Sequence, residues 1–472
     1  RGARLERMHP MAFNSFAFAV FFPTVLALYW ALKRSTRAQN TLLLVASYVF
    51  YGYVHPWFCL LLAASTLLDY AAGLAIQRVP GRRKLWLLLS VLGNLGMLGT
   101  FKYYNFFAVN LQAALAGLGL RVSLPVLRTL LPVGISFYTF QTLSYTIDVY
   151  RGRLAPRRRL SDFALFVSFF PQLVAGPIER AANLLPQIER ERTLDAGRIE
   201  TALYLLVWGY FKKLVVADNL ALFVDRIFLM PDPPGLALWA GAAGFAVQLF
   251  ADFSAYTDIA RGAARLLGFE LMRNFRAPFA ASNPGDFWNR WHISLTTWIR
   301  DYVYRALPGS ASSRAGALRN QVIVFALFGL WHGAGWNFIL WGLYYGMAAV
   351  IYLAAFRPWT RKIRARWFAA LSVVFWFLLN TVGALLFRQQ DLGMLARYFT
   401  RNPLLHTPEQ AVLGLGLLGV VAGFSAPLLL QAALRPHWER LGVARPALAW
   451  ACLAAVAFLG SEGGIEFVYF AF

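Results

Sequence analysis

Two histidines stand out in this chain as residues able to carry chemistry. His332 lies within residues 322–349, an apolar stretch long enough to cross a bilayer. His292 lies 40 residues earlier, in a segment rich in aromatic and charged side chains. An ionisable side chain at membrane depth marks a functional site by default, because placing it there is costly. Imidazole titrates near neutral pH, so a histidine can take a proton from a hydroxyl group and return it to a leaving group.

The surroundings of both histidines leave a structural alternative open. Gly333 and Gly335 permit close backbone approach around His332, and Trp336 is one of three nearby tryptophans that suit a packed wall. The alternative for His332 is a histidine hydrogen-bonded between helices for packing alone. For His292 the alternative is an ordinary histidine at the membrane interface.

Metal and cofactor chemistry is not indicated by the residue spacing. No Cys, Asp or Glu near either histidine has the ligand spacing of a zinc site. The only two cysteines, Cys59 and Cys452, both lie in apolar segments and fit neither a metal motif nor a disulfide framework. Glycine-rich phosphate loops and the GxSxG elbow are absent. We therefore expect no metal and no bound cofactor.

Two further clusters interrupt apolar runs. Gln248, Asp252 and Asp258 lie at the end of the run near 236–257, where two carboxylates suit either ion coupling in a transporter or a helix cap. The run from Phe169 to Arg180 contains two prolines and a glycine, which predict an irregular turn at a cavity or interface, with a plain loop as the alternative. The residue types alone do not decide between these alternatives for either cluster.

The composition indicates which elements must position these side chains. The 472 residues are 59% hydrophobic and 14% charged, whereas a soluble domain carries about a quarter charged residues. Apolar runs recur along nearly the whole chain and are continuous, which predicts membrane-crossing helices and not a barrel. We expect an all-α polytopic membrane protein with about 10–13 transmembrane helices and additional re-entrant or interfacial helices.

The expected membrane segments divide the chain as follows. They fall near residues 13–32, 40–54, 57–76, 85–101, 103–120, 129–148, 161–178, 201–220, 236–257, 319–340, 341–356, 367–387, 410–433 and 447–460. Residues 261–300 are too polar for lipid and too aromatic for a flexible loop, which indicates short helices lining a cavity within the bilayer. We expect one membrane-embedded domain over residues 11–460, with a core at 130–345, after a polar extension at 1–10.

The net charge of +23 suggests nucleic acid as a partner, but its placement argues against that. Basic residues cluster in short loops, such as 151–159 and 361–366. Short basic loops at helix ends are typical of the cytoplasmic face, where anionic headgroups are the partner. The first apolar stretch also precedes a basic loop, which favours a retained helix over a cleaved signal peptide.

Taken together, these stretches resemble the membrane-bound O-acyltransferase family, and within it the bacterial alginate O-acetylase branch. The resemblance covers nearly the whole chain and is carried by ordered motifs. They occupy residues 11–15, 101–105, 131–141, 172–178, 252–258, 287–295, 298–302, 330–338 and 467–472.

The resemblance implies a fold, a reaction and a set of residues. The fold is a ring of helices around a central funnel, with His332 as the catalytic histidine and His292 as the second signature position. Acetyl passes from a cytoplasmic donor, acetyl-CoA, across the bacterial inner membrane to a periplasmic acetyltransferase partner that modifies an exported polysaccharide. The residues expected to line the funnel are Trp288, Arg290, Trp291, Asn337, Trp336, Asp258 and Gln172.

Departures from the branch keep alternatives open. Residues 305–310 replace an Ile-Pro-Leu-Gly-Gly-like turn, and Ala255 replaces a common glycine. Cellulose, peptidoglycan or D-alanylated teichoic acid therefore stand beside alginate. From other classes, a flippase of lipid-linked sugar would use Asp252 and Asp258 without needing His332, and a scaffold would only position a partner enzyme.

Overall fold

The structure, a computed structural model, describes most of the chain. The described residues are 11–53, 55–127, 131–174, 176–309, 312–360, 362–363, 365–434, 442 and 444–461. This part is helical, with short 3-10 and π turns and no strand among its residues, which confirms the expected all-α fold. The expected extension at 1–10 and the final motif at 467–472 lie outside the described residues.

The chain forms two compact units. Residues 1–205 and 259–272 make the first unit, and residues 206–258 and 273–472 make the second. The long helix α12 (Gly235–Leu266) begins in the second unit, and its last residues belong to the first. The single domain expected over residues 11–460 stays a prediction.

Several helices of the described part are long and apolar enough to cross a membrane. The six that satisfy both criteria are Phe58–Arg78, Pro80–Gly117, Gly235–Leu266, Trp336–Thr360, Arg366–Arg388 and Pro408–Leu434. The 10–13 crossings expected from the sequence also counted shorter helices, such as α2 (Thr36–Gly52). The expected segment 161–178 is broken into α7 (Leu160–Ser168) and α8 (Phe170–Leu173), because a proline in the second position of α8 has no N–H to continue the helix.

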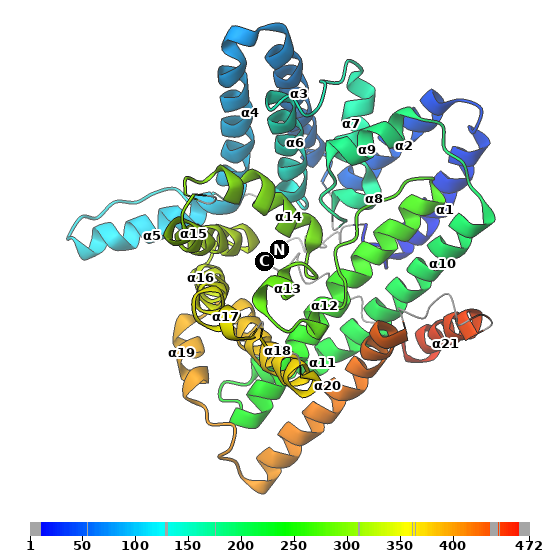
Figure 1. Ribbon diagram of the computed structural model, residues 1–472. Coiled ribbons are helices and arrows are strands. Elements are labelled where there is room, and N and C mark those ends of the chain that lie inside the picture. Colours follow the sequence, from blue (N-terminus) through cyan, green and yellow to red (C-terminus); the bar gives the residue numbers. More distant parts are fainter. Residues whose placement is uncertain are drawn as a thin grey trace, which may run out of the picture. The chain divides into compact units, whose positions relative to one another are not determined.

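In the first unit, a buried polar network joins three helices that lie side by side in Figure 1, α3 (Phe58–Arg78), α4 (Arg83–Leu98) and α6 (Ile135–Tyr150). The carboxylate of Asp69 on α3 accepts hydrogen bonds from Ser90 on α4 and, at 2.7 Å, from Thr146 on α6. The amide of Asn94 donates to the other oxygen of Asp69 at 2.6 Å. Interhelical hydrogen bonds of this kind hold membrane helices in register.

Glu179 anchors the turn that follows α8. Its carboxylate accepts hydrogen bonds from the backbone N–H of Met272 and from the Asn183 amide, the latter at 2.6 Å. The side chain is fully buried. Burial raises the pKa of Glu179 to about 7, although its hydrogen bonds and the nearby Arg261 and Arg180 guanidinium groups act to lower it. The folded protein therefore holds this proton more tightly than an unfolded chain does.

The raised pKa of Glu179 predicts a pH-dependent stability. The unfolded carboxyl group loses its proton near pH 4.3, and the folded group near pH 7. The contribution of Glu179 to stability is therefore full below about pH 4.3 and is lost as the pH rises through 7. We expect Glu179→Gln to reduce the fall in unfolding temperature between pH 5 and pH 8, measured in detergent. In the control, Glu191→Gln at an exposed position, the unfolding temperature should fall between pH 5 and pH 8 as much as in the wild type. An equally large fall in Glu179→Gln would contradict the prediction.

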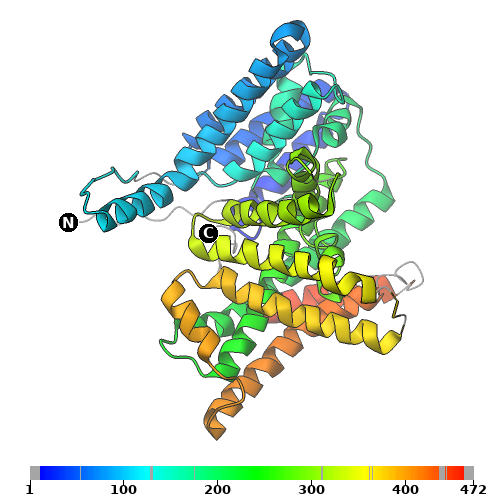
Figure 2. The ribbon, with the colours of Figure 1, turned by 60° about the vertical axis from the view of Figure 1, so that its left-hand side comes forward.

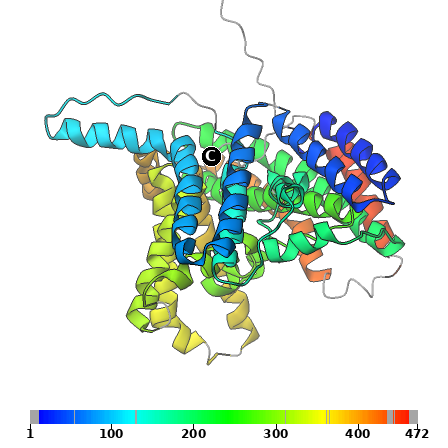
Figure 3. The same ribbon diagram turned by 90° about the horizontal axis from the view of Figure 1, so that it is seen from above.

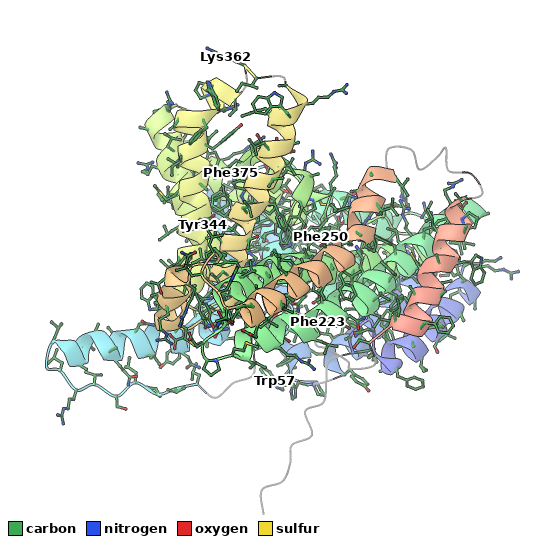
Figure 4. All side chains as sticks on the ribbon, turned by 90° about the horizontal axis from the view of Figure 1, so that it is seen from below. Trp57, Phe223, Phe250, Tyr344, Lys362 and Phe375 are labelled. Carbon is green, nitrogen blue, oxygen red and sulfur yellow. The ribbon has the colours of Figure 1, made fainter. Side chains whose placement is uncertain are left out.

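In the second unit, α15 (Arg314–His332) and α16 (Trp336–Ile351) form a tight antiparallel hairpin, seen side by side in Figure 2. Glycines permit the close approach: a Cβ atom on Gly329 would lie 3.1 Å from the Cα atom of Gly342. The pair then packs on α18 (Arg366–Arg388). Lys362, in the basic loop before α18, lies at the far end of this group of helices (Figure 4).

We expect Gly342→Ala to destabilise this hairpin. The added methyl group would overlap the backbone carbonyl oxygen of Phe325, which cannot move as a flexible side chain can. Overpacking of this kind costs about 1–3 kcal/mol. The matched control is Gly419→Ala in α20 (Pro408–Leu434), where the new methyl group meets no atom within 4 Å. Thermal unfolding in detergent should separate the two variants, and equal unfolding temperatures would refute the close-approach argument.

Candidate active site

His332 is the last residue of α15, and its ring is enclosed by aromatic side chains. The backbone at Gly333 is extended and ends the helix directly after the histidine. Ring centroids of Trp331 and Trp341 lie 4.9 Å from the imidazole, that of Phe328 at 5.0 Å and that of Phe387 at 5.3 Å. The side chain is buried. The imidazole is thus held in one orientation by its neighbours.

A cavity of about 30 Å³ lies beside His332. It is lined by Ala246, Leu249, Phe287, Trp288, Trp291, His332, Trp341, Tyr345, Asn380, Ala384 and Phe387. These residues come from α12, α13 (Pro284–Trp288) and the turn after it, the α15–α16 hairpin and α18. A water molecule needs roughly 10–15 Å³. The cavity therefore has room for a small group beside His332, among walls that are mainly aromatic.

The polar wall of this cavity is built by Tyr345 and Asn380. The Tyr345 hydroxyl donates a hydrogen bond to the Asn380 side-chain oxygen at 2.9 Å, and the Asn380 amide donates to the Trp376 carbonyl at 2.8 Å. Both side chains are fixed by these bonds. Trp288 lines the same cavity, and its buried indole N–H makes no hydrogen bond to the residues that the structure describes. A carbonyl oxygen or a water molecule in the cavity would suit that donor.

His292 occupies a constrained backbone position at the start of α14 (Ile293–Tyr302). Its φ of 40° and ψ of 53° lie in the left-handed region, which residues other than glycine rarely adopt. Asn274 holds this turn: its carbonyl accepts from the Ile293 N–H at 2.9 Å, and its side-chain oxygen accepts from the Ser294 N–H at 3.2 Å. Backbone strain that the surroundings enforce clusters at functional sites.

The His292 ring is fully buried and packs against the ring of Phe253, with centroids 4.7 Å apart. Burial lowers the pKa of His292 to about 3, so the imidazole is neutral at physiological pH. The Trp331 ring lies 6.0 Å from His292 and 4.9 Å from His332. The structure thus brings both histidines against one tryptophan.

The other predicted funnel residues divide into two groups. Trp288 and Trp291 line the cavity with His332. Asn337 lies behind it, donating to the Leu386 and Phe387 carbonyls at 3.4 and 3.3 Å and so fixing the end of α18. Trp336 is 50% exposed on the outside of α16, and Arg290 pairs with Asp286 at 2.7 Å. Neither is among the residues that line the cavity.

Gln172 and Asp258 also lie elsewhere. Gln172 belongs to the first unit, where its amide donates to the Phe166 carbonyl at 2.8 Å. Asp258 forms an ion pair with Lys212 at 2.7 Å, and Lys212 also donates to Ser254 at 2.9 Å. The carboxylates expected at the end of the run near 236–257 thus lie within α12, which continues to Leu266, and they pair with lysines instead of capping a helix end.

Lys213 forms the more deeply buried part of this cluster. Its ammonium group lies 2.8 Å from Asp218 and 3.0 Å from Asp252, and all three side chains are at most 2% exposed. Lys212 and Lys213 lie in the π-helix η3 (Phe211–Ala217). These two lysines were not among the predicted site residues, although two adjacent charges within the expected span 201–220 are a signal for buried partners.

The arrangement of these side chains suits proton transfer next to an acyl group. Among the described residues, no three His, Cys, Asp or Glu side chains gather as metal ligands. An imidazole in a largely apolar pocket, with fixed hydrogen-bond donors nearby, can move a proton to or from a hydroxyl or thiol group beside an acyl carbonyl.

Comparison with known proteins identifies the class of this enzyme. The sequence profile of the membrane-bound O-acyltransferase family matches residues 153–388, which include both histidines and every residue that lines the cavity. The chain belongs to this family, and it is a multi-pass membrane acyltransferase.

The chain is also similar to individual bacterial proteins with known names. The chain is 40% identical over 394 residues to the probable alginate O-acetylase AlgI of Pseudomonas putida, covering 82% of this chain and 79% of the relative. It is 39% identical over 395 residues to the AlgI protein of Pseudomonas aeruginosa, covering 82% and 74%. It is also 33% identical over 408 residues to the peptidoglycan O-acetyltransferase of Helicobacter pylori, covering 79% and 75%.

Proposed function

We propose that this acyltransferase moves acetyl from a cytoplasmic donor, acetyl-CoA, across the bacterial inner membrane to a periplasmic partner that O-acetylates an exported polysaccharide. The observation that carries the proposal is the buried His332 beside a small aromatic cavity with fixed polar groups. In this proposal His332 handles the proton of the acceptor or thiol group, and the neutral His292 orients the site through Trp331.

The size of the cavity supports a short acyl group. About 30 Å³ between bulky rings accommodates a group of two carbons more readily than a fatty acyl chain. Two of the relatives compared above are named as alginate O-acetylases, and the third as a peptidoglycan O-acetyltransferase. The higher identity to the former favours alginate as the polysaccharide, with peptidoglycan as the second candidate.

The ion pairs of α12 weigh against a flippase. A transporter that couples ions through Asp252 and Asp258 needs carboxylates that can bind and release their partner. Here Asp252 contacts Lys213 at 3.0 Å and Asp258 contacts Lys212 at 2.7 Å. Fixed lysines so close to both carboxylates support a structural role for this cluster.

Label transfer tests the proposed function. The purified protein, in vesicles, is given radiolabelled acetyl-CoA on one side and periplasmic fractions from alginate-producing or non-producing bacteria on the other. We expect label to appear on a protein or polysaccharide acceptor only when both the enzyme and the alginate-related fraction are present. Transfer of label only to peptidoglycan would identify peptidoglycan, and not alginate, as the modified polysaccharide. If no acceptor became labelled with any acyl donor tried, the acetyltransferase proposal would be overturned.

The cavity also predicts acyl-length preference. We expect Phe387→Ala to raise transfer from butyryl-CoA relative to acetyl-CoA by roughly ten-fold or more, because each methylene in an apolar pocket is worth about 1–3 kcal/mol. The matched control is Phe375→Ala on the same helix, whose ring is 61% exposed. The ratio of the two transfer rates is the measurement, and an unchanged ratio in Phe387→Ala would mean that this cavity does not hold the acyl group.

A further inference from the structure

Helix α5 (Tyr104–Gly117) begins where the preceding helix has already spanned a bilayer. The 16 residues of α4 and the five of the π-helix η2 (Gly99–Tyr103) rise about 31 Å. The hydrocarbon core of a membrane is about 30 Å thick. A straight continuation through α5 would therefore extend well beyond the membrane.

The chain does not continue straight. Figures 1 and 3 show α5 leaving the direction of α4 at η2, and the segment at 118–127 returning alongside it. A π-helix is a recognised cause of such bends. Residues 104–127, here called the α5 hairpin, thus run along a new direction, although the hydropathy of residues 103–120 predicts a membrane segment.

The surface of the α5 hairpin is apolar and mostly uncovered by its own unit. Residues 104–120 contain no charged side chain, and among α5 residues only Ala108 is buried. Phe107, Leu111 and Leu118 are 56%, 51% and 76% exposed. An apolar surface of this kind in water is unfavourable, so another medium must cover it.

The polar side chains of the hairpin turn inward onto its own backbone. Asn105 accepts from the Leu127 N–H and donates to the Leu127 carbonyl, both at 2.9 Å. Gln112 donates to the Val122 carbonyl at 3.4 Å, and Asn110 donates to the Phe106 carbonyl at 2.7 Å. Irregular backbone is tolerated near hydrocarbon only when its polar groups find partners within the protein. These bonds supply partners to the returning segment.

The basic loops locate the face on which the hairpin lies. Arg83, at the start of α4, donates a hydrogen bond to the Tyr150 carbonyl at the end of α6. The basic loops at 78–84 and 150–159 therefore share one face, which the positive-inside rule assigns to the cytoplasm. Since α4 and η2 cross the bilayer, the hairpin starts at the opposite face. Tyr103 and Tyr104 stand at this boundary, where aromatic belts are usual.

We propose that the α5 hairpin lies within the leaflet opposite the basic loops, covered by lipid acyl chains, and does not cross the membrane. The uncharged surface of residues 104–120 matches hydrocarbon, and Arg121, the one charged residue of the hairpin, has a side chain long enough to reach the membrane surface. The inward hydrogen bonds lower the penalty of placing the returning segment there. The hairpin is then a monotopic element attached to a spanning helix.

Spin labels at single cysteines test this placement. In a Cys59→Ser, Cys452→Ser background, cysteines replace Phe107, Leu111 or Leu118 on the hairpin. The references are Leu92→Cys, 66% exposed on α4, and Arg82→Cys in the basic loop. In phosphatidylethanolamine–phosphatidylglycerol vesicles, collision rates with oxygen and with a water-soluble nickel chelate give the depth of each label. We expect all three hairpin labels to favour oxygen, at similar depths shallower than Leu92, while Arg82 favours nickel.

Three other outcomes would overturn the proposal. Strong nickel collisions at the hairpin would place it in water. Weak collisions with both reagents would show a protein cover, either a partner or a second copy. Depths that pass through the bilayer centre from Phe107 to Leu118 would make α5 a spanning helix. Each variant is first checked by gel filtration in detergent, and a misfolded one is replaced by Val109→Cys, which is 52% exposed on the same helix.

Discussion

Replacing His332 by alanine is expected to lower acyl transfer by about 10²–10⁴-fold while leaving insertion and folding intact. The alanine removes the proton-transfer group but keeps a good helix former at the end of α15. The loss should appear in the rate at saturating acetyl-CoA, because the imidazole acts in the chemical step and not mainly in binding.

A second histidine provides the control for that experiment. His406 lies exposed in the loop between α19 (Leu392–Thr400) and α20, and His406→Ala should transfer label at the wild-type rate. Gel filtration of both variants in detergent tests folding. A His332→Ala protein that elutes normally and keeps even a third of the wild-type rate would remove His332 from the catalytic role and leave the packing interpretation.

Replacing Lys213 by methionine is expected to destabilise the second unit by about 3–5 kcal/mol. The substitution leaves Asp218 and Asp252 facing each other without the ammonium group that lies 2.8 and 3.0 Å from them. A buried charge that loses its partner is costly, whereas removing all the charges together is much less so. The expected result is a low yield of folded protein and a clearly lower unfolding temperature.

A rescue variant distinguishes the effect of an uncompensated charge from the effect of lost packing. Lys213→Met combined with Asp218→Asn and Asp252→Asn should recover much of the lost stability, because no unpaired charge remains. Lys84→Met, at an exposed position in the first turn of α4, serves as the surface control and should unfold as the wild type does. If the triple variant unfolds at the same temperature as Lys213→Met, the damage comes from lost packing and not from uncompensated charge.

The sequence predicted the helical class of the fold because continuous apolar runs have few structural solutions in a membrane. It could not predict how those runs divide. The run over 161–178 is two short helices, and the one over 103–120 turns aside at a π-helix, because bends depend on local backbone geometry that hydropathy does not record. The hydrogen bond from Arg83 to the Tyr150 carbonyl brings the loops at 78–84 and 150–159 together, a contact that the clustering of basic residues in short loops did not predict.

Part of the candidate site could also be predicted. The resemblance brought Trp288, Trp291 and His332 together, and all three line the cavity. Tyr345 and Asn380 were missed, because a single polar residue in an apolar helix does not reveal which neighbour it faces. Asn380 was detectable as a polar side chain within the expected span 367–387. Its hydrogen bond to Tyr345 depends on the packing of α16 against α18. The spacing of apolar residues along the sequence does not predict which helices pack together.

The left-handed backbone at His292 has a consequence for how variants of this enzyme behave. Glycine and asparagine fit that conformation with little strain but carry no imidazole, while most other residues fail on both counts. If the His292 ring acts as in the proposed function, position 292 has two independent requirements, one on the conformation of the main chain and one on the chemistry of the ring. Ranked by the amount of folded protein, substitutions there would follow one order, and ranked by turnover they would follow another.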